Sequence, residues 1–164
     1  MERKLKKLSE EQALSRLAAQ CARAEYCLAD MRQKMQSWEL PDGAEERILN
    51  QLVKEGYVDE QRFAQAFVRD KFRYNHWGSR RIGFELRKKN IDETIIEDAL
   101  GEIDTDSADA TLTALLEQKL RSTKGKTDYE VFLKLLRYSV GRGYSPDQAH
   151  RCLTKIIKED PETL

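Results

Sequence analysis

The stretch that decides the fold runs from residue 56 to residue 100, GYVDEQRFAQAFVRDKFRYNHWGSRRIGFELRKKNIDETIIEDAL. Its apolar residues recur at the three- and four-residue spacing that is typical of amphipathic helices. Asp59 and Asp92 stand where helix N-caps are expected, and Gly78-Ser79 separates two of the apolar stripes. We therefore predict three consecutive helices, which bury Phe63, Ala64, Phe67, Val68, Phe72, Ile82, Leu86, Ile95, Ile96, Ala99 and Leu100.

The chain on either side repeats this pattern. Upstream, Ser9 to Gln12 reads as a capping box, a second helix is expected at about residues 25–38, and a third follows Asp42 and stops at Gly56. Downstream, helices are expected to begin at Asp106, Thr127 and Pro146. Units of about 45 to 60 residues are in the range of stacked helical repeats, which bury their apolar faces against their neighbours.

We predict an all-α fold of three tandem three-helix repeats, stacked into an elongated, curved, modular array. The predicted segments are a flexible basic tail at 1–8, repeat 1 at 9–58, repeat 2 at 59–104, and repeat 3 at 105–164 with a frayed C-terminus. The alternative is nine helices without true repetition.

Composition restricts the function classes. The chain has 164 residues, with 29 basic and 29 acidic side chains, so a binding surface for nucleic acid has to be local. The three cysteines lack metal-ligand spacing, and we expect them to fill the core of a cytoplasmic, monomeric protein. No apolar run is long enough to span a membrane. We find no phosphate-binding loop, zinc-hydrolase motif or nucleophile elbow, and we expect no catalysis, metal or cofactor.

Charge is segregated along the chain. Nine basic residues and two acids lie between Arg62 and Lys89, whereas eight acids and no base lie between Asp92 and Asp109. A second, thinner basic zone follows after residue 119, and it can extend the first one if the repeats curve. The predicted partner-binding or DNA-binding residues are Arg69, Arg73, Arg80, Arg81, Phe84, Arg87, Lys88, Lys134, Arg137 and Arg142.

Two interpretations of this basic cluster stay open. An aromatic ring framed by arginines, as at Phe84, suits phosphate contact with base stacking, or an acidic protein partner with an apolar pocket. Alternatively, the basic faces are solvated and Phe84 packs on the next repeat. We favour binding for the cluster as a whole. The acidic run is interpreted as structural, because several of its acids stand at helix starts.

Two motifs resemble those of the RecX family. They are G-Y-V-D-E-Q-R-F-A at residues 56–64 and G-S-R-R-I-G-F-E-L-R-K-K-N-I at residues 78–91. Residues 23–35, R-A-E-Y-C-L-A-D-M-R-Q-K-M, are similar to an upstream element of that family, and Arg142-Gly-Tyr-Ser145 is similar to its closing repeat. The resemblance spans roughly residues 20–157.

The resemblance implies a non-enzymatic bacterial regulator of the RecA recombinase. Such proteins consist of three three-helix units and lie in the helical groove of the RecA–DNA filament. They limit filament extension, strand exchange, ATP hydrolysis and the co-protease activity that triggers the SOS response, and they bind DNA weakly. A direct DNA-binding module and a general helical-repeat adaptor are the alternatives. The adaptor is disfavoured because a period of about 34 residues is absent.

The chain departs from the RecX pattern in a few places. Asn90 replaces the usual glycine after a helix, and asparagine is the next-best residue for a left-handed conformation there. Tyr26-Cys27 and Asp30-Met31 replace residues common in the first repeat, which implies different capping. Zero net charge favours the protein surface of a filament over naked DNA as the main partner.

Overall fold

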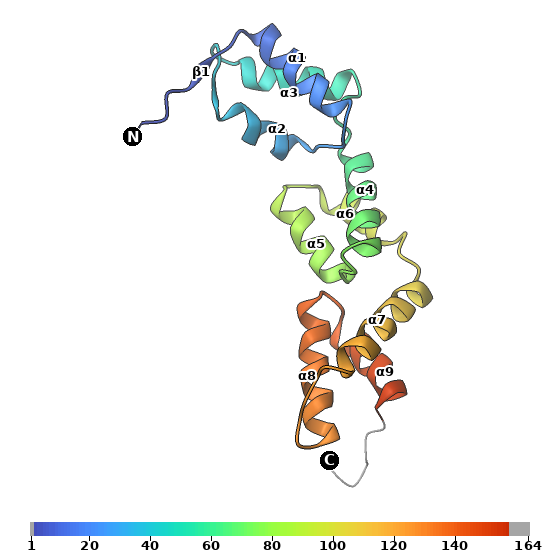
Figure 1. Ribbon diagram of the computed structural model, residues 1–164. Helices are drawn as coiled ribbons and strands as arrows, with labels where there is room; N and C mark the ends of the chain where they lie inside the picture. The colour runs from blue at the N-terminus through green and yellow to red at the C-terminus, as the bar shows by residue number, and fades with distance from the viewer. Residues whose placement is uncertain (1, 158–164) are drawn as a thin grey trace. The chain divides into compact units, whose positions relative to one another are not determined.

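The computed structural model describes residues 2–157, and residues 158–164, expected as a frayed end, lie outside the described residues (Figure 1). Within this range, nine helices confirm the predicted all-α fold, with α1–α3, α4–α6 and α7–α9 as the three-helix repeats. The elements are β1 (Lys6–Lys7), α1 (Glu10–Cys21), α2 (Leu28–Met35), β2 (Trp38–Glu39), α3 (Ala44–Lys54), α4 (Glu60–Arg73), α5 (Ser79–Lys88), α6 (Glu93–Leu100), α7 (Thr105–Leu120), α8 (Asp128–Gly141) and α9 (Pro146–Ile156).

The chain forms two compact units, and the division runs through the middle repeat. The first unit comprises Met1–Ala66 and Leu86–Ile96, and the second comprises Phe67–Glu85 and Glu97–Leu164. Each unit therefore holds one complete terminal repeat together with the parts of the middle repeat that pack on it.

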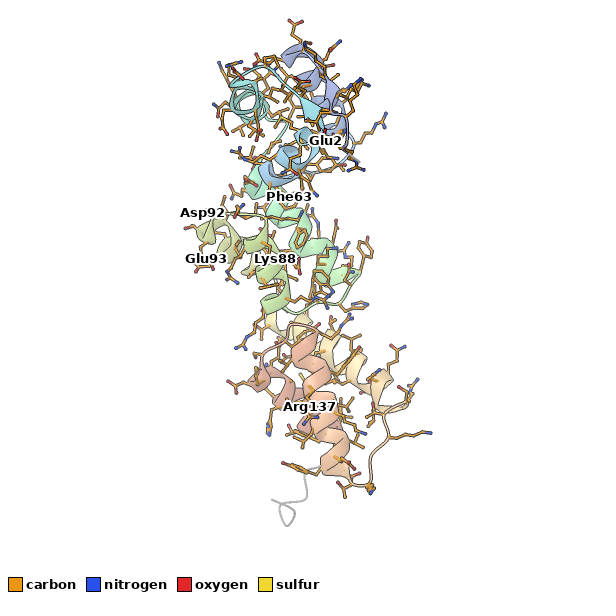
Figure 2. All side chains as sticks on the ribbon, turned by 90° about the vertical axis from the view of Figure 1, so that its left-hand side faces the viewer. Glu2, Phe63, Lys88, Asp92, Glu93 and Arg137 are labelled. Carbon is orange, nitrogen blue, oxygen red and sulfur yellow. The ribbon has the colours of Figure 1, made fainter. Side chains whose placement is uncertain are left out.

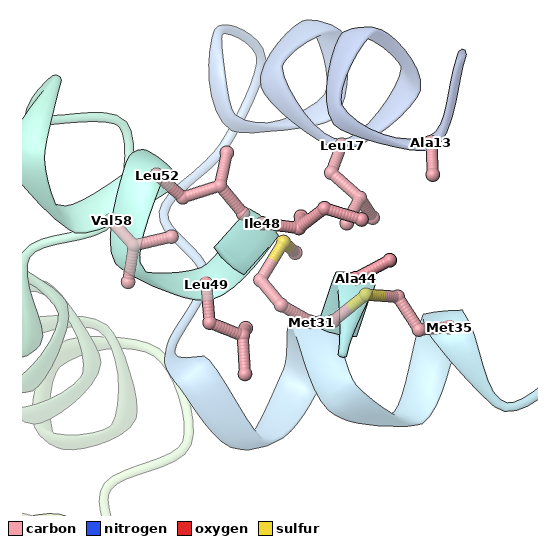
Figure 3. Packing of buried hydrophobic residues seen from close by; sticks show 9 residues of the cluster. All are labelled: Ala13, Leu17, Met31, Met35, Ala44, Ile48, Leu49, Leu52 and Val58. Carbon is pink, nitrogen blue, oxygen red and sulfur yellow. The ribbon is translucent and has the colours of Figure 1, made fainter. Parts of the chain in front are cut away.

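The core of the first unit lies among α1, α2 and α3. Figure 3 shows Met31 of α2 and Ile48 of α3 directed toward Leu17 of α1, and these three residues and Met35 of α2 are almost fully buried. The predicted capping box opens α1, since Ser9 Oγ accepts from the Gln12 amide at 3.1 Å and Gln12 Oε1 accepts from the Ser9 amide at 3.0 Å. The remaining core residues are Ala13, Ala44, Leu49, Leu52 and Val58.

The start of the chain differs from the expected flexible tail. Lys6–Lys7 forms a short parallel strand with Trp38–Glu39, and Leu8 is only 5% exposed. The backbone therefore gains hydrogen bonds, and Leu8 is removed from water. The second helix also ends at Met35 rather than at residue 38, because the following residues supply the partner strand.

Helix α3 begins differently from the prediction. Its N-cap is Gly43, in the left-handed conformation with φ of 72°, and no side chain caps the helix. Asp42 was the expected cap. The glycine turns the chain sharply into α3, and the position of its Cβ would lie 2.7 Å from a guanidinium nitrogen of Arg47.

The first unit joins repeats 1 and 2 through side chains. Lys89 Nζ lies 2.7 Å from Asp30 Oδ1, and Arg62 Nε lies 2.6 Å from Glu25 Oε1. Lys89 is positioned by the left-handed residue that follows it, Asn90, with φ of 59° as the sequence predicts. The amides of Asn90 and the next residue donate back to the carbonyls of residues 87 and 86, so α5 ends in a Schellman motif.

The core of the second unit lies among α7, α8 and α9, which lie side by side (Figure 1). The predicted starts of α8 and α9 are confirmed, where Thr127 and Ser145 accept hydrogen bonds from the backbone, each at 3.1 Å. Helix α7 begins at Thr105, one residue before the expected start at Asp106, and its N-cap is Asp104. The buried core residues are Leu112, Leu116, Phe132, Leu135, Tyr144, Ala149, Cys152, Leu153 and Ile157.

The second unit joins repeats 2 and 3 through the backbone. The amide of Gly78 donates to the carbonyl of Arg142 at 2.8 Å, and the amide of Arg80 donates to the carbonyl of Gly143 at 3.0 Å. A Cβ on Gly78 would overlap the Gly143 backbone, and a Cβ on Gly143 would lie 2.7 Å from the Arg81 nitrogen. The two glycines therefore allow the two backbone segments to come closer together than any side chain would permit. The Tyr144 hydroxyl adds a hydrogen bond between them by donating to the His76 carbonyl at 3.0 Å.

We predict that Gly143→Ala destabilises the protein far more than Gly56→Ala. Both glycines have positive φ, at 101° and 76°, but nothing lies within 4 Å of a Cβ on Gly56. The conformational penalty alone is about 1–3 kcal/mol, and the overlap at Gly143 adds about 1–3 kcal/mol. Urea unfolding of both variants measures the difference, and equal losses would contradict the close-contact interpretation.

Glu60, the first residue of α4, carries a buried carboxylate oxygen with no hydrogen-bond partner in the described part of the chain. Burial raises the pKa of the Glu60 carboxyl, and the charges of Asp30 and Asp59 raise it further, while the Leu28 backbone amide opposes them. Between the ordinary pKa and this raised one, the folded chain holds the proton more tightly than the unfolded chain. Stability therefore falls as pH rises through that window.

We predict that Glu60→Gln raises the melting temperature at neutral pH. The gain should shrink as the pH is lowered to values at which Glu60 is protonated in both states, because an uncharged carboxylic acid and an amide are similar there. Thermal unfolding across a pH series measures this, with Glu55→Gln, an exposed side chain in the same unit, as the control. A gain that is the same at every pH would contradict the assignment.

Candidate binding surface

Helix α5 begins against the usual electrostatic rule. Its first turn has no acid, and two arginines, Arg80 and Arg81, stand there beside the positive end of the helix dipole. The carbonyls of Arg142 and Gly143 accept from the start of this helix and replace a side-chain cap. The result is a fixed concentration of positive charge at one end of α5.

Arg81 is held in place by an aromatic ring. Its guanidinium carbon lies 4.1 Å from the ring centroid of Trp77, and Lys71 Nζ lies 4.9 Å from the same centroid. Arg81 is accordingly half-buried, whereas Arg80 is exposed and has no ion pair within residues 2–157. Arg80 is therefore the more available of the two for a partner.

Among the described residues of the second unit, three Phe or Tyr side chains are exposed: Tyr74, Phe84 and, on α8, Tyr129. Phe84, predicted to belong to the surface, is 56% exposed, and it lies one turn after Arg80 on α5. Tyr74 is 71% exposed, and sequence reasoning missed it. Helical spacing from Phe67 would have placed Tyr74 on the buried stripe of α4, but the helix ends at Arg73.

Helix α8 carries the next predicted residues. Arg137 lies exposed on this helix (Figure 2), one turn before Val140, which is 42% exposed. Lys134 is exposed too, but its Nζ donates to the carbonyl of Lys124 at 2.5 Å and so ties the α7–α8 loop. The end of α8 leads into the carbonyls of Arg142 and Gly143, which accept hydrogen bonds from the amides of Gly78 and Arg80.

Two further predicted residues, Arg142 and Arg87, also have structural partners. Arg142 is half-buried, and its guanidinium donates to the Asn75 carbonyl, which clamps the α4–α5 turn. Arg87 forms a two-pronged ion pair with Glu93 at 2.6 and 2.9 Å, near the start of α6. Lys88, the next residue along the chain, is exposed at the end of α5 (Figure 2).

The other two, Arg69 and Arg73, line a pocket in the second unit. The pocket has a volume of about 430 Å³ and lies between the end of α4 and the start of α7. Both side chains are exposed. Sequence reasoning placed these arginines on a surface, but nothing in their spacing indicated a hollow.

The acidic run between residues 92 and 109 has structural partners at several positions. Besides Glu93, Asp104 caps α7 by accepting from the Ser107 amide at 3.0 Å, and Asp109 accepts from Arg151 and Gln148. Burial alone would raise the pKa of the Asp109 carboxyl, but these hydrogen bonds outweigh it and hold the pKa below its ordinary value. These acids thus anchor helices.

The described residues give no sign of metal or membrane chemistry. Among residues 2–157, no three His, Cys, Asp or Glu side chains gather as metal ligands would. In that same range, no helix combines the length and apolar character of a membrane span. What the chain offers is a set of cationic and aromatic side chains fixed on rigid helices.

This architecture defines a class, the all-α helical-repeat proteins. A family model described as RecX, second three-helix domain, matches residues 59–100. The chain is 29% identical over 147 residues to the regulatory protein RecX of Streptomyces lividans, covering 90% of this chain and 77% of that one. It is 31% identical over 128 residues to that of Mycolicibacterium vanbaalenii, covering 74% and 70%.

A crystal structure of RecX from Lactobacillus salivarius shares the fold, with a TM-score of 0.78 and 18% identity, covering 90% of this chain and 96% of that one. The chain therefore belongs to the RecX family of regulatory proteins.

We predict that Arg80→Glu stabilises the protein, whereas Arg87→Glu destabilises it. An acid in the first turn of α5 suits the helix dipole, and the exchange should add about 0.5–1 kcal/mol. An acid at position 87 instead faces the Glu93 carboxylate. Chemical unfolding of the two variants measures both signs, and a loss of stability in Arg80→Glu would show that Arg80 has a structural role.

Proposed function

We propose that this protein is a non-enzymatic modulator, mainly an inhibitor, of the RecA recombinase. In this proposal it binds in the groove of the RecA–DNA filament and limits filament extension, ATP hydrolysis, strand exchange and co-protease activity. It thereby regulates DNA repair and the SOS response in the cytoplasm, as a monomer. Membership of the RecX family supports the proposal, and so does the surface of the second unit.

The observation that carries the proposal is the pair of arginines at the start of α5. Their placement costs helix stability, by about 0.3–1 kcal/mol for each charge beside the dipole. Residues that break a local rule are expected at functional sites, and exposed Arg80, which has no ion pair within residues 2–157, fits this expectation. In the proposed complex the filament contains DNA, and a rigid cationic helix end is suited to contact with phosphates.

Because its charges balance, we expect the chain to bind the filament through shape complementarity and local clusters of charge. With 29 basic and 29 acidic residues, long-range attraction to DNA is weak. We propose repeats at 9–58, 59–104 and 105–164 as the modules that follow the filament. Repeats of this kind present extended surfaces suited to long partners.

Direct binding to single-stranded nucleic acid is a second candidate. The exposed rings of Tyr74 and of Phe84, which lies one turn after Arg80 on α5, favour it, because bases stack on such rings at about 1–3 kcal/mol each. Its signature is an affinity that falls steeply as salt rises. Binding to an oligothymidylate in a salt series tests it, and absence of binding at low salt would exclude it.

We predict that this protein lowers the DNA-dependent ATPase of the RecA from the same organism at substoichiometric ratios. Arg80→Gln combined with Arg137→Gln should raise the concentration for half inhibition by about tenfold, since each exposed charge contributes up to about 1 kcal/mol. A steady-state ATPase assay across several salt concentrations measures both effects.

The matched control removes two charges elsewhere on the second unit. Arg121→Gln combined with Lys155→Gln changes the net charge equally, and both side chains are exposed. This control should inhibit like the unmodified protein. No inhibition of RecA at equimolar protein would refute the proposed function, and equal weakening by both double variants would refute the assignment to α5 and α8.

A further inference from the structure

The pocket at the end of α4 has an apolar floor. Val68, Phe72 and Ile103 line it together with the basic and acidic side chains at its rim. Its volume of about 430 Å³ falls within the range of about 300–1,000 Å³ that is usual for ligand pockets. It can admit one large apolar side chain together with adjoining backbone.

One wall of the pocket is basic. Arg69, Arg73 and His76 follow each other at helical spacing along the end of α4 and the turn after it. Within residues 2–157, none of these three side chains forms a hydrogen bond or an ion pair. His76 is also held in the left-handed conformation, with φ of 54°, while its carbonyl accepts from Tyr144. The fold thus holds a bulky residue in a strained conformation at the pocket.

The opposite wall is acidic. Glu102 and Asp104 lie in the turn between α6 and α7, and Asp104 is fixed there by its hydrogen bonds to Ser107. Two walls of opposite sign across an apolar floor suit a ligand that carries a carboxylate on one side and hydrogen-bond donors on the other. A peptide backbone next to an acidic side chain has this arrangement.

We propose that this pocket binds an acidic peptide segment of a protein partner, with one apolar side chain seated on the floor. The carboxylates of the segment meet Arg69 and Arg73, and its backbone amides donate to the carboxylates of the opposite wall. A nucleic acid is disfavoured, because its continuous phosphates would meet Glu102 and Asp104. The floor also lacks an exposed ring on which a base could stack, since Phe72 is half-buried.

This pocket proposal rests on the proposed function for the identity of the partner. It adds the chemistry by which the protein would bind a surface segment of the recombinase. The binding step itself does not require RecA. It can therefore be tested with a synthetic peptide, and the two proposals can fail separately.

The test uses a fluorescein-labelled pentapeptide in which two glycines precede a leucine and two glutamates follow it. Fluorescence anisotropy measures its affinity for the full chain at low salt. A peptide with glutamines in place of the glutamates tests the charge, and one with glycine in place of leucine tests the floor. Both replacements should weaken binding by about tenfold or more, given the transfer energy of a leucine side chain and the loss of several charge contacts.

Variants of the pocket locate the binding. Arg69→Gln combined with Arg73→Gln should weaken binding of the acidic peptide by about tenfold. The control pair Arg121→Gln and Lys155→Gln should leave it unchanged. His76→Asn removes the imidazole but keeps a residue that tolerates the left-handed conformation, so it should weaken binding without lowering the melting temperature.

The outcomes separate the two proposals. Peptide binding that depends on both arginines and on leucine, without inhibition of RecA, supports the pocket and refutes the proposed function. Inhibition of RecA without such peptide binding refutes the pocket alone. Equal binding of the charged and uncharged peptides refutes it as well, and so does an oligothymidylate that displaces the acidic peptide from the pocket.

Discussion

The backbone contact between Gly78 and Gly143 is the constraint on which the second unit depends. Two carbonyls from the turn after α8 accept from the first amides of α5, and neither glycine can carry a side chain without overlap. The turn before α5 is clamped by Arg142 and Tyr144 at the same place. The arginines that begin α5 and the histidine at the pocket therefore take their positions from one short segment of the third repeat.

The two units join neighbouring repeats through different kinds of contact. In both, a residue of positive φ follows the second helix of a repeat, at Asn90 and at Gly143, and the chain at this position contacts the preceding repeat. In the first unit, that contact is made by the ion pair of Lys89 with Asp30, close to the poorly satisfied carboxylate of Glu60. Charge contacts respond to salt and pH, whereas backbone hydrogen bonds without titratable groups do not. We therefore expect the contact between repeats 1 and 2 to respond to salt and pH more strongly than the contact between repeats 2 and 3.

Much of the fold could be predicted because its signals are local. The capping residues Ser9, Thr127 and Ser145 each act within three residues, and so the sequence reveals them. The short strand at Lys6–Lys7 escaped prediction, since its partner lies some thirty positions away and its residues are polar. The roles of Arg87 and Arg142 also escaped it, because sequence shows where a charge lies on a helix but not which carboxylate or carbonyl meets it. The pocket is of the same kind, since it is formed by segments from two repeats.

The capping of α5 by the third repeat has a consequence for synthesis of the chain. A helix is usually nucleated by residues next to it, which leave the ribosome together with it. Helix α5 obtains the acceptors for its first amides from carbonyls more than sixty residues later. Until residues 142 and 143 have emerged, two arginines stand at the positive end of the α5 dipole, and the amides of Gly78 and Arg80 lack their carbonyl acceptors. The middle repeat of a nascent chain therefore stays unfinished until the last repeat is nearly complete, and its cationic end is fixed only in the finished protein.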